Sequence, residues 1–112
     1  MRAAQKERLA RNESFFREVN ERIGDVADRL GGDGATYEYL CECADTSCTE
    51  RISLTAAEYE NVRADGARFV LSPGHALEDL EVVVHRQPDH LVVEKIGVAG
   101  ETAEDLDPRA DY

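Results

Sequence analysis

Apolar residues recur at helical spacing along the first thirty residues of the chain. Five of them follow one another at intervals of three or four positions: Phe16, Val19, Ile23, Val26 and Leu30. This is the period of one face of an α-helix, and Leu9 continues the stripe one heptad upstream. The glycine-rich segment at residues 31–34 ends the pattern, because glycine readily adopts the left-handed conformation that closes a helix. The pattern therefore predicts one long N-terminal helix.

The two halves of this helix are expected to differ in what they contact. Residues 15–30 can bury their stripe on the chain's own sheet. Residues 1–14 are harder to bury in so small a domain, so we interpret them as a helix extension that is mobile or binds a partner. Such pairing, in a homodimer through the N-terminal helix or with another protein, would use Leu9, Phe16, Val19 and Ile23.

Alternation of apolar and polar residues predicts strands in the rest of the chain. Residues 36–41 carry aromatic side chains, and residues 49–54 form the returning strand of a β-hairpin. Residues 68–71 form a further apolar strand, and residues 80–86 and 91–95 form a second hairpin. Strands joined by short connections pair antiparallel. We therefore expect a small, mostly antiparallel sheet.

The segment after residue 54 carries a signal for the start of a helix. Thr55 and Glu58 have the spacing of a capping box, in which each side chain accepts a hydrogen bond from the backbone amide of the other residue. Leu54 and Tyr59 are placed as the accompanying hydrophobic staple. A short helix to about Ala64 is therefore expected between the strands.

Together these elements predict an α+β fold with a single domain at residues 15–97. The long N-terminal helix packs on the sheet, the short capped helix lies between strands, and the first hairpin carries the candidate chemistry. Residues 98–112 contain several Asp and Glu residues and little to bury, so we expect them to form an acidic tail.

The formal charge of −11 is unevenly distributed. Residues 1–22 contain six Lys or Arg and four Glu, whereas residues 23–112 contain seven Lys or Arg and twenty Asp or Glu. Such an acidic body repels phosphate backbones, which argues against nucleic acid and is compatible with a basic protein partner. No apolar run approaches the roughly 20 residues that cross a bilayer, and the first residues do not resemble a secretory signal. We therefore expect a cytoplasmic protein that does not bind membranes.

All three cysteines fall within eight residues, at Cys41, Cys43 and Cys48. Their odd number and the expected reducing compartment argue against a disulfide framework. Cys41 and Cys43 would lie about 6.6 Å apart on a strand, which is poorly suited to a disulfide between them. Because the residues around them are polar, we interpret the cluster as metal ligands rather than as small buried hydrophobic residues.

A metal site built on these thiolates needs a fourth ligand. Zinc prefers a tetrahedron, and Cys₃His is a common structural set, although C-x-C-x₄-C is less typical than paired C-x₂-C motifs. His75 is the best candidate because it follows the constrained turn at Pro73-Gly74, whereas His85 ends a strand and His90 lies at a turn. Asp45 or a water molecule is the alternative, and a bound water would open the site to catalysis.

Several segments resemble an uncharacterised group of small acidic proteins of actinobacteria. The matching segments are Phe16–Ile23, Cys41–Asp45 with Cys48, Ile52–Arg63, Pro73–His75 and Val92–Gly97. The resemblance extends from about residue 11 to residue 109. It implies a bacterial cytosolic setting, but no activity, cofactor or catalytic residue.

We therefore expect a non-enzymatic protein-interaction or regulatory module with a structural zinc at Cys41, Cys43, Cys48 and His75. The alternative is a redox sensor that uses reactive thiolates or an iron–sulfur cluster. A metal-dependent hydrolase with three protein ligands and a bound water ranks last. The sequence lacks a phosphate-binding glycine loop and a nucleophile elbow.

Overall fold

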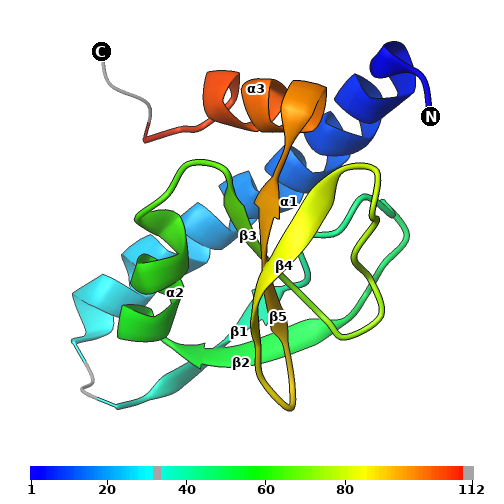
Figure 1. Ribbon diagram of the computed structural model, residues 1–112. Helices are drawn as coiled ribbons and strands as arrows, with labels where there is room; N and C mark the ends of the chain where they lie inside the picture. Colours follow the sequence, from blue (N-terminus) through cyan, green and yellow to red (C-terminus); the bar gives the residue numbers. More distant parts are fainter. Residues whose placement is uncertain (32–33, 110–112) are drawn as a thin grey trace.

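The computed structural model of the chain describes residues 1–31 and 34–109, and Figure 1 shows how its elements are arranged. In chain order they are α1 (Ala3–Leu30), β1 (Thr36–Leu40), β2 (Arg51–Thr55), α2 (Ala56–Arg63), β3 (Arg68–Leu71), β4 (Glu81–Arg86), β5 (Leu91–Lys95) and α3 (Gly97–Asp105). The predicted α+β class, the long N-terminal helix and the short helix between strands are confirmed.

The strands form two small antiparallel sheets rather than one. β1 pairs with β2 in the first sheet, and β5 lies between β3 and β4 in the second. The two hairpins are those that the alternation of residues predicts. A β-bulge at Val84 interrupts the pairing of β4 with β5, and both Val83 and Val84 pack against the core.

The main hydrophobic core joins both sheets to α2. Tyr39 of β1 stacks on Tyr59 of α2 with ring centroids 4.4 Å apart, and Phe69 of β3 is fully buried in the same cluster. Burial of a large apolar side chain contributes roughly 1.5–3 kcal/mol, so this cluster is a major source of stability. Cys41 and Cys43 also belong to it, which anchors the loop between β1 and β2 in the core.

The capping box at the start of α2 is confirmed. The Glu58 amide donates to Thr55 Oγ1 at 3.1 Å, and the Thr55 amide donates to Glu58 Oε1 at 2.8 Å. The predicted staple residues, Leu54 and Tyr59, are buried in the same core cluster. These contacts fix where β2 ends and α2 begins.

The buried face of α1 is largely polar. Glu13, Arg17 and Asn20 are completely buried. Arg17 Nη2 donates to the Ala103 carbonyl at 2.7 Å, and Asn20 Nδ2 donates to the Leu40 carbonyl at 2.8 Å. These contacts with other elements set the rotation of the helix about its axis.

As a result, the apolar stripe of α1 is only partly buried. Phe16 is buried, while Ile23 and Leu9 pack against the main core and a smaller second cluster, respectively. Val26 and Leu30 remain 52% and 69% exposed, so the expectation that they pack on the sheet is wrong. Three of the four residues assigned to partner binding thus contact the chain's own interior.

The helix α3 packs against the N-terminal half of α1, as the orange and blue ribbons in Figure 1 show. Ala99 and Ala103 are fully buried, and Gly100 lets α3 lie close to the end of β5, because a Cβ there would lie 3.0 Å from the Lys95 carbonyl oxygen. The prediction of a tail is therefore wrong for residues 98–105. Residues 110–112 of that predicted tail lie outside the described residues.

The predicted helix extension at residues 1–14 is also buried in part. Ala10 and Glu13 are completely buried, and Asn12 Nδ2 donates to the Ala44 carbonyl at 3.0 Å. These residues are covered by α3 and by the loop that follows β1. The sequence analysis did not predict α3, which packs on the N-terminal half of α1 and buries it.

Three charged residues are buried between α1 and the second sheet. Lys95 Nζ contacts Glu13 and Glu81, and all three side chains are completely buried; we refer to this set as the Lys95 triad. Burial lowers the pKa of Lys95 and raises that of Glu13, while their mutual attraction opposes both shifts. The triad connects α1 to β4 and to the end of β5.

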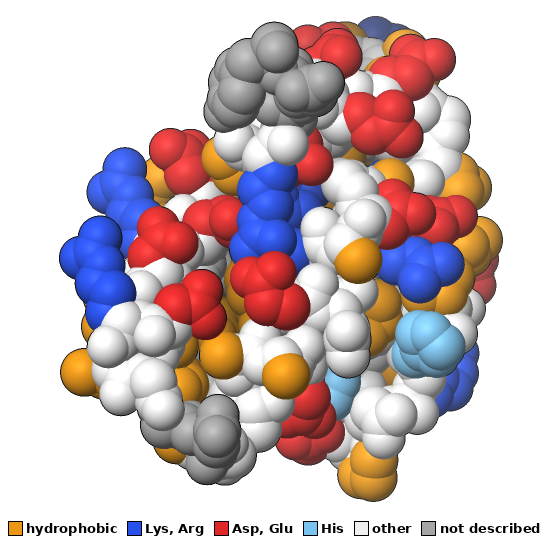
Figure 2. Space-filling view, turned by 90° about the vertical axis from the view of Figure 1, so that its left-hand side faces the viewer, with side chains coloured by type: hydrophobic (Ala, Val, Ile, Leu, Met, Phe, Trp, Pro, Cys, Tyr) orange, Lys and Arg blue, Asp and Glu red, His pale blue; other side chains and the backbone are white. Residues whose placement is uncertain are grey.

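A second ionic cluster holds the chain after α3. Arg63 contacts Asp107 and lies 2.6 Å from Glu21, and Arg109 lies 2.7 Å from both Glu21 and Glu60. Figure 2 shows acidic and basic side chains side by side on this face of the molecule. The cluster joins α1 and α2 to the segment beyond α3.

Candidate metal centre

The structure brings Cys41, Cys43, Cys48 and His75 into one group. One ligand atom from each residue lies within 4.8 Å of all the others. Cys41 Sγ lies 3.6 Å and Cys48 Sγ 3.7 Å from His75 Nδ1. In a tetrahedral zinc site with Zn–S near 2.3 Å and Zn–N near 2.1 Å, adjacent sulfur and nitrogen ligands lie about 3.6 Å apart. The residues therefore have the spacing that a four-coordinate ion requires.

The ligands come from two loops on the same side of the molecule. The three cysteines lie between β1 and β2, and His75 lies between β3 and β4 (Figure 1). The Cys41 amide donates to the Glu50 carbonyl at 3.2 Å, which continues the pairing of β1 with the chain entering β2. The next amide, that of Glu42, donates to the Val70 carbonyl at 2.8 Å. The cysteine loop thus passes from one sheet to the edge of the other.

Glu42 fixes this crossing from inside the protein. Its side chain is completely buried and accepts hydrogen bonds from the Val70 amide at 2.9 Å, the Tyr59 hydroxyl at 2.8 Å and Asn20 Nδ2 at 3.0 Å. Burial raises the pKa of the Glu42 carboxyl, although these three donors oppose the shift. Because side chains alternate along an extended segment, Glu42 points to one side of this segment and its two cysteine neighbours share the other.

Cys48 is returned to the site by a turn. The Cys48 amide donates to the Asp45 carbonyl at 3.0 Å, and the Asp45 carboxylate accepts from the Ser47 amide at 2.9 Å and from Ser47 Oγ at 2.6 Å. These bonds from Ser47 lower the pKa of Asp45. The carboxylate is therefore used to form the turn, and Asp45 is not part of the ligand group.

A tight turn also positions His75. Gly74 has a φ of 85°, a backbone conformation that residues other than glycine rarely adopt. The His75 amide donates to the Ser72 carbonyl at 3.1 Å. The Ser72 amide in turn donates to Cys41 Sγ at 3.2 Å. An amide directed at sulfur is typical of thiolate ligands, since it stabilises the negative charge.

The three thiols differ in their ease of ionisation. A hydrogen bond from Cys43, supported by the Ser72 amide, lowers the pKa of Cys41. The interaction with Cys41 and burial raise the pKa of Cys43, and burial raises that of Cys48. Without a bound cation, the protein environment therefore favours ionisation of one cysteine rather than of all three. A divalent cation supplies the positive charge that three adjacent thiolates need.

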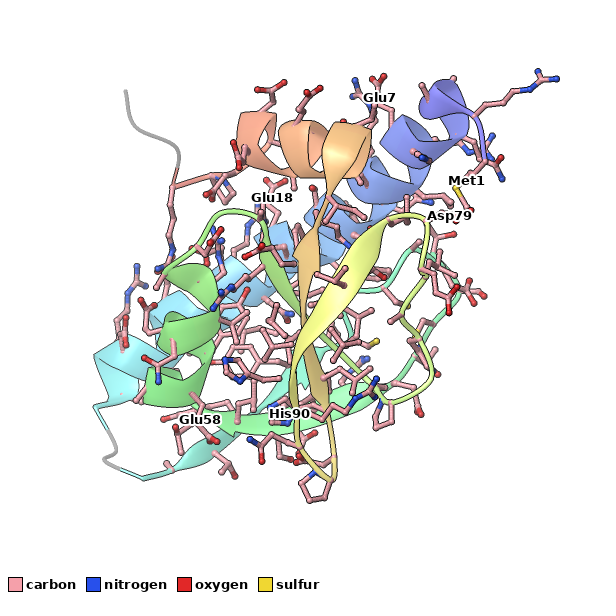
Figure 3. The ribbon with its side chains drawn as sticks, in the orientation of Figure 1. Met1, Glu7, Glu18, Glu58, Asp79 and His90 are labelled. Carbon is pink, nitrogen blue, oxygen red and sulfur yellow. The ribbon has the colours of Figure 1, made fainter. Side chains whose placement is uncertain are left out.

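The sequence-based candidates His85 and His90 lie away from this group. They line a separate cavity of about 420 Å³ between α2 and the second sheet, to which Glu58 and Asp89 also contribute. Figure 3 labels Glu58 and His90 on this side of the molecule. His90, which the sequence places at a turn, is buried, and its Nδ1 lies 2.8 Å from Asp89 Oδ1. Both carboxylates are thus engaged, Glu58 in the capping box and Asp89 with the histidine.

Sequence reasoning missed the supporting residues of the site. Glu42 is one of the polar residues around the cysteines, but it is completely buried together with its partner Asn20. Both Cys41 and Cys43 are buried as well, whereas Cys48 and His75 are half-buried. The sequence signal for Glu42 was a charged residue between two cysteines in an extended segment. Such a residue is either exposed on the surface or buried with hydrogen-bond partners.

Comparison of the chain with known protein families, with curated proteins and with solved structures finds no match. None of the described helices is long and apolar enough to cross a membrane. The functional argument therefore rests on the Cys₃His group itself.

Proposed function

We propose that Cys41, Cys43, Cys48 and His75 bind one zinc ion and that this ion is structural. The observation that carries the proposal is the spacing of the four ligand atoms, all within 4.8 Å of one another, with sulfur–nitrogen distances of 3.6 and 3.7 Å. Three thiolates and one imidazole complete the zinc tetrahedron, and structural sites are closed in this way, whereas catalytic sites keep a position for water. A hydrolytic role is accordingly disfavoured.

The position of the site indicates what such an ion does for the fold. The cysteine loop and the His75 loop have little regular structure of their own, and the first joins two strands of one sheet while the second joins two strands of the other. An ion bound between them joins residues 27 and 34 positions apart in the chain. In structural sites the free energy of metal binding is free energy of folding. The ion therefore holds the two sheets in a fixed relation.

We further propose that the domain is a non-catalytic interaction or regulatory module of the bacterial cytoplasm. The net charge of −11 supports a partner with a basic surface, since complementary charge accelerates and directs association. The resemblance to small actinobacterial proteins supports the bacterial setting. The alternative redox function would use the same ligands, with Cys48 as the most accessible thiol, and would replace zinc by an iron–sulfur cluster or by thiol chemistry.

Elemental analysis and an absorption spectrum of the purified protein test the proposal. We expect about one zinc per chain, no visible colour, and the visible bands of tetrahedral cobalt–thiolate coordination after exchange with Co²⁺. His75→Ala is expected to weaken zinc binding by about 100-fold or more, whereas His85→Ala, a matched histidine outside the site, should leave it unchanged. Removal of zinc by a chelator should lower the midpoint of unfolding in urea.

Other results would contradict this assignment. Iron with visible absorption would favour the redox sensor. Full zinc content in His75→Ala together with hydrolytic activity would favour an open catalytic site. A folded protein that binds no metal, even with added Zn²⁺ at neutral pH and with reduced thiols, would refute the metal centre.

A further inference from the structure

One side of α1 presents apolar residues to solvent. Phe15, Val26 and Leu30 expose 59%, 52% and 69% of their surface, and Val19 is half-buried between them. We refer to these four residues as the outer stripe. With 3.6 residues per turn, they lie on one face and span about 24 Å along the helix axis. A continuous apolar face of this length on a charged helix is typical of a helix-pairing surface.

The outer stripe is uncovered because the opposite side of the helix is fixed by polar contacts. Glu13, Arg17 and Asn20 face the interior, where they contact β5, α3 and β1. The centre of the outer stripe lies roughly 140° around the helix from that buried face. The helix cannot turn the stripe inward without breaking the Lys95 triad and the buried hydrogen bonds of Asn20. The stripe is therefore available to another molecule.

The charges along the exposed edge of the stripe indicate which molecule fits. Glu18, Arg22, Asp25 and Arg29 are all exposed and alternate in sign along the helix. When the order of these four residues is reversed, each position carries a charge opposite to the one it has in the original order. An antiparallel copy would therefore set Glu18 against Arg29 and Arg22 against Asp25, whereas in a parallel two-fold pair this edge would lie on opposite sides of the interface and would not meet its own copy. The edge is complementary to itself in one orientation only.

We propose that α1 pairs with α1 of a second copy of this chain, antiparallel, through the outer stripe. Val19 packs against Val26 of the second copy, and Phe15 packs against Leu30. The two-fold axis passes near residues 22 and 23, so each contact occurs twice. This surface differs from the one that the sequence predicts, because Phe16, Leu9 and Ile23 are used within the domain. The inference does not depend on the metal centre.

Sedimentation equilibrium over a range of protein concentrations tests the pairing. The wild-type mass should rise from that of one chain to twice that value. Val26→Gln removes apolar contact on both sides of the axis and should weaken the dimer at least about tenfold. Val82→Gln is the matched control, since Val82 is 46% exposed on β4, away from the stripe, and should leave the dimer unchanged. Circular dichroism should show that both variants keep the wild-type fold.

A charge exchange tests the orientation. Arg22→Glu should weaken the dimer at least about tenfold, because it sets a carboxylate at position 22 against Asp25 of the second copy. The double variant Arg22→Glu/Asp25→Arg should restore the affinity to within about threefold of wild type. A wild-type protein that stays monomeric up to millimolar concentration would overturn the proposal. So would equal weakening by Val26→Gln and Val82→Gln, or a double variant no tighter than Arg22→Glu alone. These outcomes test the dimer whether or not the protein binds zinc.

Discussion

Replacement of Asn20 by Asp tests whether the polar interior of α1 holds the metal loop in place. Asn20 Nδ2 donates to the Leu40 carbonyl at 2.8 Å and to Glu42 Oε2 at 3.0 Å, while its Oδ1 accepts from the Leu40 amide at 2.8 Å. Asp has nearly the same shape, but it places an oxygen where the donating nitrogen was. That oxygen then faces two acceptors, one of which is a buried carboxylate.

The expected loss of folding free energy follows from the cost of protonating the introduced carboxyl. Two buried carboxylates about 4 Å apart repel each other by about 4 kcal/mol at an effective dielectric constant of 20. Protonating an aspartate of ordinary pKa near 3.9 at pH 7 costs a similar amount, about 4 kcal/mol, and the protonated side chain could again donate to Leu40 or Glu42. The loss is therefore expected to be about 4 kcal/mol at pH 7, a large part of the 5–15 kcal/mol typical of a domain.

The sign of the pH dependence follows from the same reasoning. The folded-state pKa of the introduced carboxyl is raised by burial and by Glu42, whose own pKa is already raised. Stability contributed by the protonated form is present below the unfolded-state pKa and is lost as the pH rises toward the folded-state pKa. Relative to wild type, Asn20→Asp should therefore lose about 1.4 kcal/mol per pH unit between pH 5 and pH 7.

Urea unfolding followed by circular dichroism at pH 5, 6 and 7, with zinc in excess, measures this difference. Asn20→Ala is the control: it leaves the Leu40 amide and carbonyl without their side-chain partner, which costs about 2–6 kcal/mol, but it adds no titrating group. Because it also removes one donor to the Glu42 carboxyl, its loss relative to wild type should rise with pH, but less steeply than that of Asn20→Asp. A flat difference between Asn20→Asp and wild type across this range would show that residue 20 does not face Glu42 as described.

Three further substitutions test other contacts in the structure. Lys95→Met leaves the two carboxylates of the Lys95 triad buried without a cation, and we expect a loss of about 3–5 kcal/mol in urea unfolding; an effect below about 1 kcal/mol would contradict the triad. Gly66→Ala places a Cβ 2.6 Å from Asp107 Oδ2 and should cost about 1 kcal/mol. Gly24→Ala, whose Cβ would lie 3.8 Å from Tyr59 Cδ2, should instead stabilise α1 by about 0.5–1 kcal/mol; thermal unfolding distinguishes the opposite signs.

Local signals in the sequence were sufficient to predict most elements and the proximity of the four candidate ligands. The capping box of Thr55 and Glu58 depends on residues three positions apart, so its geometry is encoded locally. The joining of the cysteine loop to His75 was predicted for a different reason. Three clustered thiols need a fourth donor, and His75 follows a constrained turn.

The buried polar residues could not be predicted in this way. Periodicity identifies the apolar face of α1, but the rotation of the helix depends on partners far along the chain, such as Lys95 for Glu13 and Ala103 for Arg17. A charged residue within a helix is usually exposed, and only its distant partner reveals that it is buried. Sequence periodicity alone therefore placed Val26 on the wrong side.

The helix α3 was missed because its buried residues are small. Ala99, Gly100 and Ala103 are all buried, but they contribute little hydrophobicity. A detectable signal was the spacing of Ala99, Ala103 and Leu106, which is helical. The abundant acidic residues of this segment concealed it, since they cover the exposed side of the same helix.

The packing of α3 and β5 on α1 also determines the order in which the protein can fold during its synthesis. Glu13 and Lys95 are separated by 82 residues, and Arg17 and Ala103 by 86. At translation rates of about 5–20 residues per second, α1 emerges from the ribosome several seconds before the residues that cover it. During that interval its charged inner face and its outer stripe are both open to water. Native packing of the first helix is thus late relative to its synthesis, and chaperones that bind nascent helices have time to act on this segment.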